Sequence, residues 1–590
     1  MRIDVRAAAP IVAICALGVT LRLTGLQYGL PAVYNPDEVA IMTRALSFGR
    51  GTLNPHNFLY PTFFFYVLFA WVGVYLGVLW ITGRVASIGA LQRLIFTDPT
   101  GIYTAGRLLG VAAGTVTIPL LYRLCEALTD RRTAIVAALF LAVAPLHVRD
   151  SHYIKHDIPA TLAIVIAYLA IVRIWPCPRA EGPRQREVVI AAAACGVAFS
   201  THYYCVFLAA PLTLAILHAR WSHGAAAWAR DLLVAAAVSA AVFFALSPFL
   251  LVEPMTALRD IAANRQIVVD RAVAEGAFAP AWRYAVMLWS DAAGWRIALL
   301  AAIGVATTLV SAPARASLLL AFPVPFLIFI ANTAPASRYL NPVLPFLVIF
   351  AASGLSSLAK WMGNSTTVFW IFATVAAFVG VEKSAAVGLF FRADDTRTLA
   401  ERHLESQIPP GSTVLTQPYS VVLTPSREGL VEALTRNLGA PENASIKFQL
   451  QLSQDPYPSP AYRLIYLGRG GLDADKIYVD PADLAAGLEP LRGLGVAYVV
   501  IKRYNKPDPE TLPLLAVLAR EGRLLARFSP YRAGLSDAEQ ARIDPFLHNT
   551  DARIDKGLER PGPTVEIWQL ENAAGRAAGD GVPRRTNEAR

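Results

Sequence analysis

Two carboxylates that follow the first apolar run of this chain are its clearest candidates for chemistry. Asp37 and Glu38 end the segment Tyr34-Asn35-Pro36-Asp37-Glu38, and a third carboxylate, Asp157, stands where a later apolar run begins. Acidic side chains next to lipid are costly, so carboxylates at the ends of hydrophobic runs favour a function. A carboxylate in a partly desolvated site can act as a general base that removes a proton from a hydroxyl group.

Helix capping is the alternative for these acidic residues. Asp37 and Glu38 precede a predicted helix from Val39 to Phe48, and carboxylates stabilise a helix N-terminus. Asp157 could cap the following span in the same way. Its surroundings are more polar than a cap requires, since they hold His147, Arg149, Asp150, Ser151, His152, Lys155 and His156. Ion pairing among Arg149, Asp150 and Asp157 is a second alternative.

Four histidines suggest an acceptor or metal site near the carboxylates. His152 and His156 are four residues apart, so on a helix they would share a face that suits a divalent metal ion. His56 or His202 would supply a third ligand. Surface histidines without any ligand are the alternative, and the spacing alone does not decide between the two.

A late arginine is the candidate for binding an anion. Arg338 and Tyr339 lie where a predicted outer loop re-enters the membrane. A guanidinium there can hold a phosphate through two parallel hydrogen bonds, or it can extend to lipid headgroups. Arg22 and Arg107 occupy comparable positions, so together the three arginines predict an electropositive outer vestibule for an anionic lipid substrate.

The composition places these residues in a protein that crosses a membrane many times. The chain has 590 residues, of which 55% are hydrophobic and 16% charged, whereas soluble proteins carry about 25% charged residues. Apolar runs of about 17–25 residues predict about eleven membrane-spanning helices. We expect one further apolar stretch, Phe58 to Ile81, to form a juxtamembrane or re-entrant helix, with a true crossing as the alternative. No basic-aromatic pattern typical of a nucleic-acid partner is present.

Lys and Arg in the short loops predict the orientation, because these residues concentrate on the cytoplasmic side of a membrane. Arg2 and Arg6 precede the first span, so the N-terminus is expected to be cytoplasmic. Asp37 and Asp157 then face outward, as does the C-terminal part. The sequence therefore predicts a multi-pass protein of the cytoplasmic (inner or plasma) membrane, in contact with membrane lipids.

The chain changes character near Phe391, where apolar runs give way to mixed segments. We predict a multi-span membrane domain at 1–390, an extracytoplasmic soluble α/β domain at 391–572 and a disordered tail at 573–590. Alternating helix and strand signals are typical of such an α/β domain. The expected helices are 394–408 and 482–494, and the expected strands are 412–416, 497–501 and 564–570.

The order and spacing of these motifs resemble the GT-C membrane glycosyltransferases, in particular the protein O-mannosyltransferase and aminoarabinose-transferase-like group. The segments that carry the likeness are 21–23 with 36–38, 53–61, 106–109, 148–157, 338–345 and 395–411. The chain departs from the group at His202, where many members carry a lysine. It also has Leu59-Tyr60 where the aminoarabinose transferases carry a Glu-Lys pair.

The resemblance implies a membrane enzyme that moves a sugar from a polyprenyl-phosphate donor to a hydroxyl group of a lipid, glycan or protein outside the cytoplasmic membrane. By position, Asp37 would be the general base, Glu38 would support it, and Asp157 would hold the acceptor or the base. Arg338 would bind the donor phosphate with Tyr339 and Arg107. We expect inversion at the anomeric carbon. A divalent metal requirement stays open.

A multi-span transporter or lipid flippase is the competing function, and a non-catalytic membrane scaffold is a third. Transporters often contain repeats and broken helices near the middle of the membrane. The sequence shows no repeat, and its carboxylates lie at one face. A scaffold would point Asp37 and Asp157 into solvent or lipid headgroups instead of toward one shared site.

Overall fold

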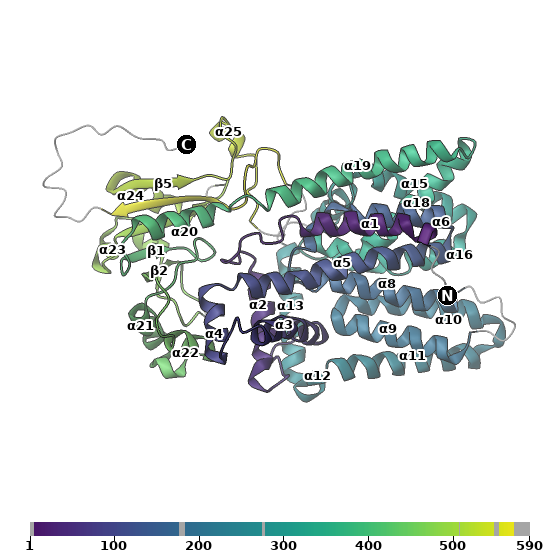
Figure 1. Ribbon diagram of the computed structural model, residues 1–590, viewed down its shortest axis with the longest axis horizontal. Coiled ribbons are helices and arrows are strands. Elements are labelled where there is room, and N and C mark those ends of the chain that lie inside the picture. Colours follow the sequence, from purple (N-terminus) through teal and green to yellow (C-terminus); the bar gives the residue numbers. More distant parts are fainter. Residues whose placement is uncertain are drawn as a thin grey trace.

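The computed structural model shows a bundle of long helices that ends in an α/β domain (Figure 1). It describes residues 5–175, 183–273, 278–471, 473–506, 508–547 and 554–570. The helices of the bundle are α1 (Val5–Leu23), α5 (Thr100–Leu128), α6 (Arg131–Ala142), α8 (Asp157–Ile174), α9 (Gln185–Thr201), α10 (Ala209–Arg220), α11 (Ala225–Leu246), α15 (Trp295–Ser311), α16 (Pro313–Leu320), α17 (Pro323–Ile330), α18 (Leu344–Trp361) and α19 (Thr366–Phe390).

The apolar length of these helices confirms a polytopic membrane protein. Within the described ranges, eight helices are long and apolar enough to cross a membrane, or nine if the bent pair at 279–292 and 295–311 forms one span. The predicted number was about eleven. The eight include α3, which the predicted eleven did not. The difference arises because α1, of which Ala9–Leu23 counts as a shorter apolar helix, α6, with 12 residues, and α9, with 17, fall short of a full crossing by their own length.

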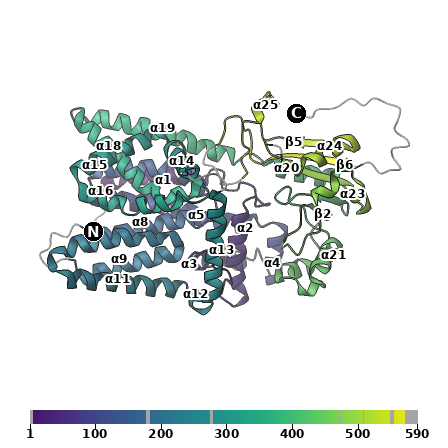
Figure 2. The same ribbon diagram turned by 180° about the vertical axis from the view of Figure 1, so that it is seen from behind.

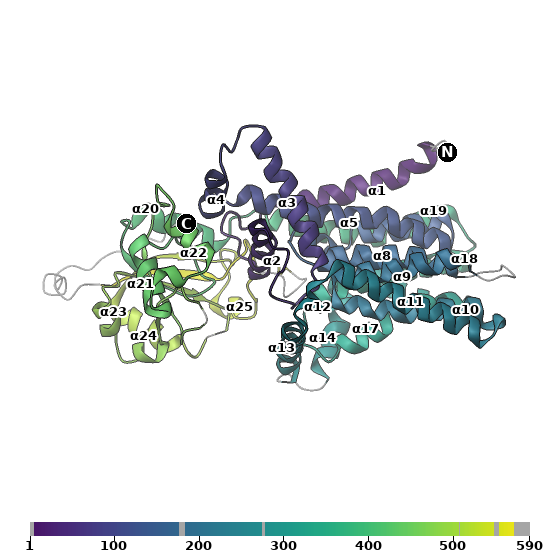
Figure 3. The ribbon, with the colours of Figure 1, turned by 90° about the horizontal axis from the view of Figure 1, so that it is seen from below.

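Three helices lie across the direction of the bundle, at the end nearest the α/β domain. α2 (Pro36–Ser47) and α13 (Pro254–Val273) run crosswise in two opposite views (Figures 1 and 2). α3 (Phe63–Ile81) also crosses the bundle direction (Figure 3). By length and composition α3 could span a membrane, but its direction favours the expected juxtamembrane helix over a crossing. Trp71, Val74 and Trp80 are exposed along it, as suits a helix in the interface.

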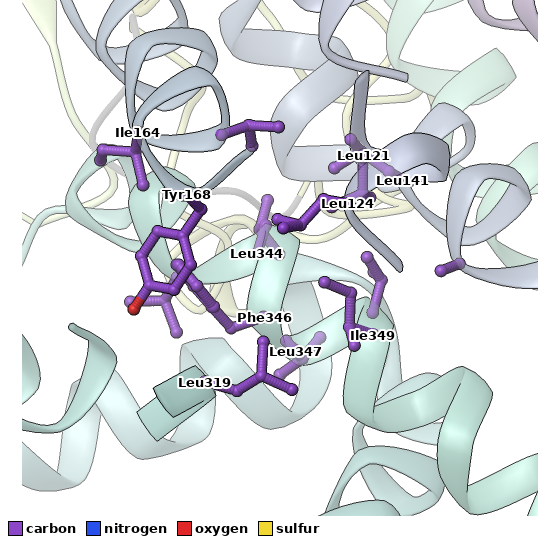
Figure 4. Packing of buried hydrophobic residues seen from close by; sticks show 14 of the residues in the cluster. Leu121, Leu124, Leu141, Ile164, Tyr168, Leu319, Leu344, Phe346, Leu347 and Ile349 are labelled. Carbon is purple, nitrogen blue, oxygen red and sulfur yellow. The ribbon is translucent and has the colours of Figure 1, made fainter. Parts of the chain in front are cut away.

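The core of the bundle forms where α5, α6, α8 and α18 meet (Figure 4). Leu121, Ile164 and Phe346 are fully buried there. Close packing of α15 against α18 requires glycine, because a Cβ atom at Gly304 would stand 1.7 Å from the Phe350 carbonyl oxygen. Gly354 faces the same contact from the other helix, with 2.1 Å to the Leu300 oxygen.

The C-terminal domain contains a six-stranded mixed sheet in the order β3-β2-β1-β4-β6-β5. The strands β1 to β4 pair in parallel, and β6 pairs antiparallel with both β4 and β5. Their bounds are β1 (Thr413–Thr416), β2 (Arg463–Leu467), β3 (Tyr478–Val479), β4 (Tyr498–Arg503), β5 (Gly522–Phe528) and β6 (Thr564–Leu570). The helices of this domain are α20 (Thr396–Gln407), α21 (Arg427–Leu438), α22 (Ile446–Leu452), α23 (Glu489–Gly493), α24 (Leu512–Glu521) and α25 (Asp537–Gln540). The remaining short helices belong to the N-terminal part of the chain: α4 (Ile88–Thr97), α7 (Pro145–Asp150), α12 (Phe249–Val252) and α14 (Ala279–Met287).

Most of the elements expected for this domain are present. α20 matches the helix expected at 394–408, and β1, β4 and β6 match the three expected strands. The single helix expected at 482–494 is wrong: a 3₁₀ turn, Pro481–Leu484, and the short α23 stand there instead. Pro490 lies in the first turn of α23, where its missing amide hydrogen would have no partner in the helix, so proline suits the start of a new helix here better than the middle of a single long one. The tail predicted at 573–590 lies outside the described residues.

The C-terminal domain rests on the loop that leads to the acidic pair. Tyr28 stacks on Phe391, with ring centroids 4.7 Å apart. The Tyr34 hydroxyl lies 2.8 Å from the Thr398 Oγ1, and the Arg397 guanidinium covers the Tyr34 ring at 3.8 Å. The domain and the loop are therefore joined by both apolar and polar contacts.

Candidate active site

Asp37 lies in the first turn of α2, but it does not cap that helix. Asn35 is the N-cap, and its side-chain oxygen accepts a hydrogen bond from the Asp37 amide at 3.1 Å. The Asp37 carboxylate instead meets the Lys155 ammonium, with 2.5 Å between Oδ2 and Nζ. The Asp37 side chain is 43% exposed, whereas Lys155 is 4% exposed. A carboxylate held by a buried cation and open to solvent can receive a substrate proton.

Glu38 turns inward, away from this position. Its carboxylate is fully buried and binds Arg107 through two hydrogen bonds of 2.9 and 2.8 Å. It also accepts the Ile154 amide at 3.0 Å. Glu38 thereby connects α2, α5 and the segment before α8. These contacts favour a positioning role over direct support of the base.

Arg107 and Arg22 are both bonded inside the protein. Arg107 Nη1 donates to the Leu26 and Tyr28 carbonyl oxygens. Arg22 Nη1 donates to the Ala142 carbonyl oxygen, and its Nη2 lies 2.8 Å from His147 Nδ1. The expected vestibule lined by these two arginines is wrong, because both side chains are buried. Nothing in these contacts supports the predicted binding of a donor phosphate by Arg107.

The short helix α7 holds the segment that carries Arg338. Arg149 and Asp150 form a buried ion pair of 2.7 Å. Arg149 also donates to the Ser337 hydroxyl at 3.0 Å, and Asp150 accepts the Asn341 amide at 2.6 Å. Ser337 and Asn341 belong to the 3₁₀ helix η5 (Ser337–Val343). Two of the polar residues before Asp157, Arg149 and Asp150, therefore form part of the expected ion pairing. Through their bonds to Ser337 and Asn341 they position η5.

Arg338 brings a guanidinium to the two carboxylates. It lies over the Tyr339 ring, 5.0 Å from the centroid. Its electrostatic neighbours include Asp157, Asp37 and Tyr60. Asp157 is buried and interacts with Arg338 and with Lys155. The structure thus brings together Asp37, Asp157, Arg338 and Tyr339, which the sequence predicted separately.

Aromatic rings and imidazoles form one side of this cluster. Tyr60 stacks on His156 at 4.2 Å, and His202 stacks on Tyr204 at 3.7 Å. The Tyr60 and His202 rings meet edge to face at 5.3 Å. Burial lowers the pKa of His156 well below its usual value, so its imidazole is neutral. His156 and His202 can therefore offer hydrogen bonds and ring surface to a substrate, but not charge.

Sequence reasoning missed two residues of the cluster, Lys155 and Tyr60. Lys155 stood among the polar residues before Asp157, and its nearness in the chain to that carboxylate was the available signal. Burial lowers its pKa, and so does the nearby Arg338, while Asp37 acts in the opposite direction. For Tyr60 the available signal was its position in Leu59-Tyr60, the pair at which the sequence departs from the resemblance described above.

The four histidines do not gather around a metal ion. α7 ends at Asp150, so His152 and His156 do not share a helix face, and both are buried, so the alternative of surface histidines is wrong for these two. His152 faces the Val148 and Thr24 carbonyl oxygens, and the exposed His56 pairs with Glu253 at 3.1 Å. Over the described part of the chain, no group of three or more His, Cys, Asp or Glu side chains is placed to hold a metal.

Comparisons with known proteins give one family match and several similar solved structures. Residues 86–251 match the model of a family described as dolichyl-phosphate-mannose-protein mannosyltransferase. ArnT from Cupriavidus metallidurans bound to undecaprenyl phosphate is similar in structure, with a TM-score of 0.50 at 13% identity over 95% of this chain and 98% of that one. ArnT in the apo state matches with a TM-score of 0.50 at 14% identity, over 89% and 97% of the two chains.

A search of curated proteins gives no match. The similarity to ArnT nevertheless extends along nearly the whole chain and includes both the helix bundle and the C-terminal domain. The family match covers α5, α8 and the segment between them that bears Lys155 and Asp157. Residues 86–251 therefore resemble a mannosyltransferase family, and the chain as a whole has the architecture of ArnT, which is the GT-C fold.

Proposed function

We propose that the protein transfers a sugar from a polyprenyl-phosphate donor to a hydroxyl group of a lipid, glycan or protein, with Asp37 as the general base. The observation that carries the proposal is the shared electrostatic site of Asp37, Asp157 and Arg338 at the start of α2, α8 and η5. It joins a carboxylate open to solvent with a guanidinium able to hold a phosphate.

Among the three carboxylates, Asp37 is the one suited to proton transfer. Glu38 is bonded on both oxygens to Arg107, and Asp157 is buried between two cations, Arg338 and Lys155. Lys155 fixes the direction of the Asp37 carboxylate through Oδ2. We assign Asp157 to holding Lys155 and Arg338 in place.

Arg338 and Tyr339 are assigned to the donor phosphate. The similar structure of ArnT is bound to undecaprenyl phosphate, which supports a site in this fold for the polyprenyl-phosphate part of the donor. During transfer, the acceptor oxygen forms a bond to the anomeric carbon while the bond from that carbon to the phosphate oxygen breaks. The acceptor proton passes to Asp37. Negative charge grows on the departing phosphate, where a guanidinium already in place stabilises it.

The attack takes place on the face of the sugar opposite the phosphate, so the anomeric configuration inverts. We assign catalysis to a membrane domain at 1–390 and place the domain at 391–572 on the same side as the acidic loop, to which it is bonded. The loops at the other end of the bundle carry Arg123, Arg131, Arg132, Arg184, Arg186, Arg220 and Arg230. Such loops are typically cytoplasmic, so the site faces out of the cytoplasmic membrane.

Transfer by the purified protein from radiolabelled polyprenyl-phosphate sugars tests this proposal. Asp37→Asn is expected to lower transfer by about a hundredfold to ten-thousandfold, the usual contribution of a general base, while binding of the donor persists. Asp394→Asn is the matched control, because Asp394 is exposed and forms an ion pair with Arg402 on the surface. Near-normal transfer by Asp37→Asn would reject the role of this carboxylate.

A further inference from the structure

The sheet of the C-terminal domain has a topological switch point between β1 and β4. From β1 the chain continues outward through β2 to β3, and β4 then returns to pair on the opposite side of β1. In open sheets of this kind, ligands bind outside the carboxyl ends of the strands at such a switch point. The residues at this edge are Thr416 to Ser420 after β1, and Lys502 to Tyr504 at the end of β4.

The turn after β1 is strained and leaves polar groups unpaired. Tyr419 has a φ of +61°, a left-handed conformation that is unfavourable for a bulky residue. Its ring is 70% exposed, so burial of the ring does not hold it there. The hydroxyl oxygens of Thr416 and Ser420, each 1% exposed, have no hydrogen-bond partner within the described ranges. Strain and unpaired polar groups of this kind are typical of ligand sites.

A lysine stands at the centre of this edge. The Lys502 ammonium donates to the Pro418 carbonyl oxygen at 2.5 Å, and its backbone amide donates to the Gln417 side chain at 2.8 Å. The rings of Tyr419 and Tyr504 both lie 5.8 Å from the ammonium, and both are exposed. One cation between two exposed aromatic rings can bind an acidic group and stack on a ring-shaped ligand.

The same edge faces the loop that leads to the base. Arg397 is an electrostatic neighbour of both Lys502 and Tyr504, and it lies on the Tyr34 ring. Tyr34 precedes Asp37 by three residues. A ligand at this edge would therefore lie on the side of the domain that contacts the acidic loop.

We propose that the carboxyl edge of β1 and β4 binds an acidic sugar of the acceptor, with Lys502 contacting its carboxylate or phosphate and Tyr419 and Tyr504 stacking on its ring. The assignment of this sugar to the acceptor rests on the proposed function. The binding of an acidic sugar at this edge does not depend on that function. The simpler role for Lys502 is to fix the turn through its bond to Pro418. Protection of Lys502 by a ligand separates a binding role from this structural role.

Chemical labelling of the full-length protein measures binding without turnover. Burial lowers the pKa of Lys502 to about 8, so at that pH its amine reacts readily with an acylating reagent. The probes are glucuronic acid, galacturonic acid and glucose 6-phosphate, compared with glucose, galactose and inorganic phosphate. At a concentration of about ten times Kd, an acidic sugar is expected to slow labelling of Lys502 about tenfold, by the factor 1 + [L]/Kd.

Lys476 is the internal control, because it also lies near a tyrosine ring but pairs with Asp473 at 2.9 Å. Its labelling is expected to stay constant. Protection of Lys502 by none of the acidic sugars, or equal protection by neutral sugars, would overturn the proposal. Equal protection by inorganic phosphate would leave only an anion site and would overturn the assignment to a sugar.

Tyr419→Gly gives a second readout that a structural role would not produce. Glycine adopts positive φ without strain, so the melting temperature is expected to rise or stay the same while protection of Lys502 is lost. Unchanged protection would reject the stacking role of Tyr419. In transfer assays, Lys502→Gln is expected to raise the acceptor KM. Asp37→Asn should keep the protection, so failure of catalysis and failure of this site are distinguishable.

Discussion

Adjacent carboxylates in this protein have opposite environments. Asp37 faces solvent beside Lys155, whereas Glu38 is buried against Arg107. The difference follows from the start of α2, since successive residues in a helical turn point in different directions. A sequence motif that contains both residues therefore combines one group suited to reaction with one suited to holding the fold together.

The Glu38–Arg107 pair predicts a large loss of stability on its disruption. Glu38→Gln leaves the Arg107 charge buried without its partner, which costs about 3–5 kcal/mol. Thermal unfolding of the purified protein would measure the change. Asp394→Asn is the control, and it should unfold near the wild-type temperature because Asp394 is exposed and forms only a surface-type ion pair with Arg402, which is itself exposed. Equal melting temperatures for Glu38→Gln and wild type would contradict the assignment.

Arg338 permits a test of phosphate recognition. Arg338→Lys keeps the charge but loses the planar fork that binds two phosphate oxygens at once. We expect transfer to fall by about a hundredfold to a thousandfold, as on loss of a donor that stabilises transition-state charge. Steady-state kinetics with a labelled donor would show the loss in kcat. Lys360→Arg, far along α18 near its end, is the control, and a full rate for Arg338→Lys would refute the bidentate role.

At the scale of elements, α5 and η5 place residues that come from distant parts of the chain. α5 approaches the segment before α8 so closely that a Cβ atom at Gly110 would stand 2.8 Å from the Ser151 carbonyl oxygen and 3.1 Å from that of Tyr153. η5 is fixed by Arg149 and Asp150 of α7. The site thus depends on contacts between elements rather than on any one motif.

This close approach predicts an effect of Gly110→Ala. The added methyl group must displace the backbone before Lys155, and such overpacking costs about 1–3 kcal/mol. Unfolding temperature and transfer rate should both fall. Gly73→Ala in α3 is the control, because a Cβ atom there meets nothing within 4 Å. Alanine in mid-helix is expected to be neutral or to stabilise by about 0.5–1 kcal/mol. Equal effects of the two substitutions would argue against tight packing at Gly110.

The sequence predicted helices and strands better than it predicted the contacts between residues that are far apart in the chain. Local sequence patterns were sufficient for α20, β1, β4 and β6, because such patterns reflect local burial, whereas β2, β3 and β5 were not predicted. It could not show that Arg107 bonds to Glu38, since those residues are 69 positions apart. The convergence of Asp37, Asp157 and Arg338 was predictable only through resemblance to a family. The Lys155 contact required the three-dimensional structure.

At the scale of the whole molecule, the two parts of the chain meet at a titratable contact. Glu401 of α20 is an electrostatic neighbour of Tyr34 in the acidic loop. Burial raises the pKa of the Glu401 carboxyl from 4.5 to about 8, and the nearby Glu405 acts in the same direction. The folded protein therefore holds a proton there that the unfolded chain releases at lower pH.

This shift predicts that stability falls as pH rises from about 4.5 to about 8. In that window the unfolded state has already lost the proton and the folded state must lose it against burial, so folding is penalised increasingly. Glu401→Gln should remove this part of the pH dependence and stabilise the protein near pH 8. Melting temperatures across the window, with exposed Glu442→Gln as control, would test it. An unchanged pH profile in Glu401→Gln would reject the contribution.

The bonding of Tyr28 and Tyr34 to the C-terminal domain has a consequence for control of the enzyme from outside. Because Asp37 follows this anchored loop, a small rotation of the domain would change the position of Asp37, the base in our proposal, relative to its substrate. A binder raised against a remote face of the domain, such as α21, could therefore act as an allosteric modulator of turnover. Its effect would come from a movement of the domain that shifts the loop, and the binder would not block the lipid donor.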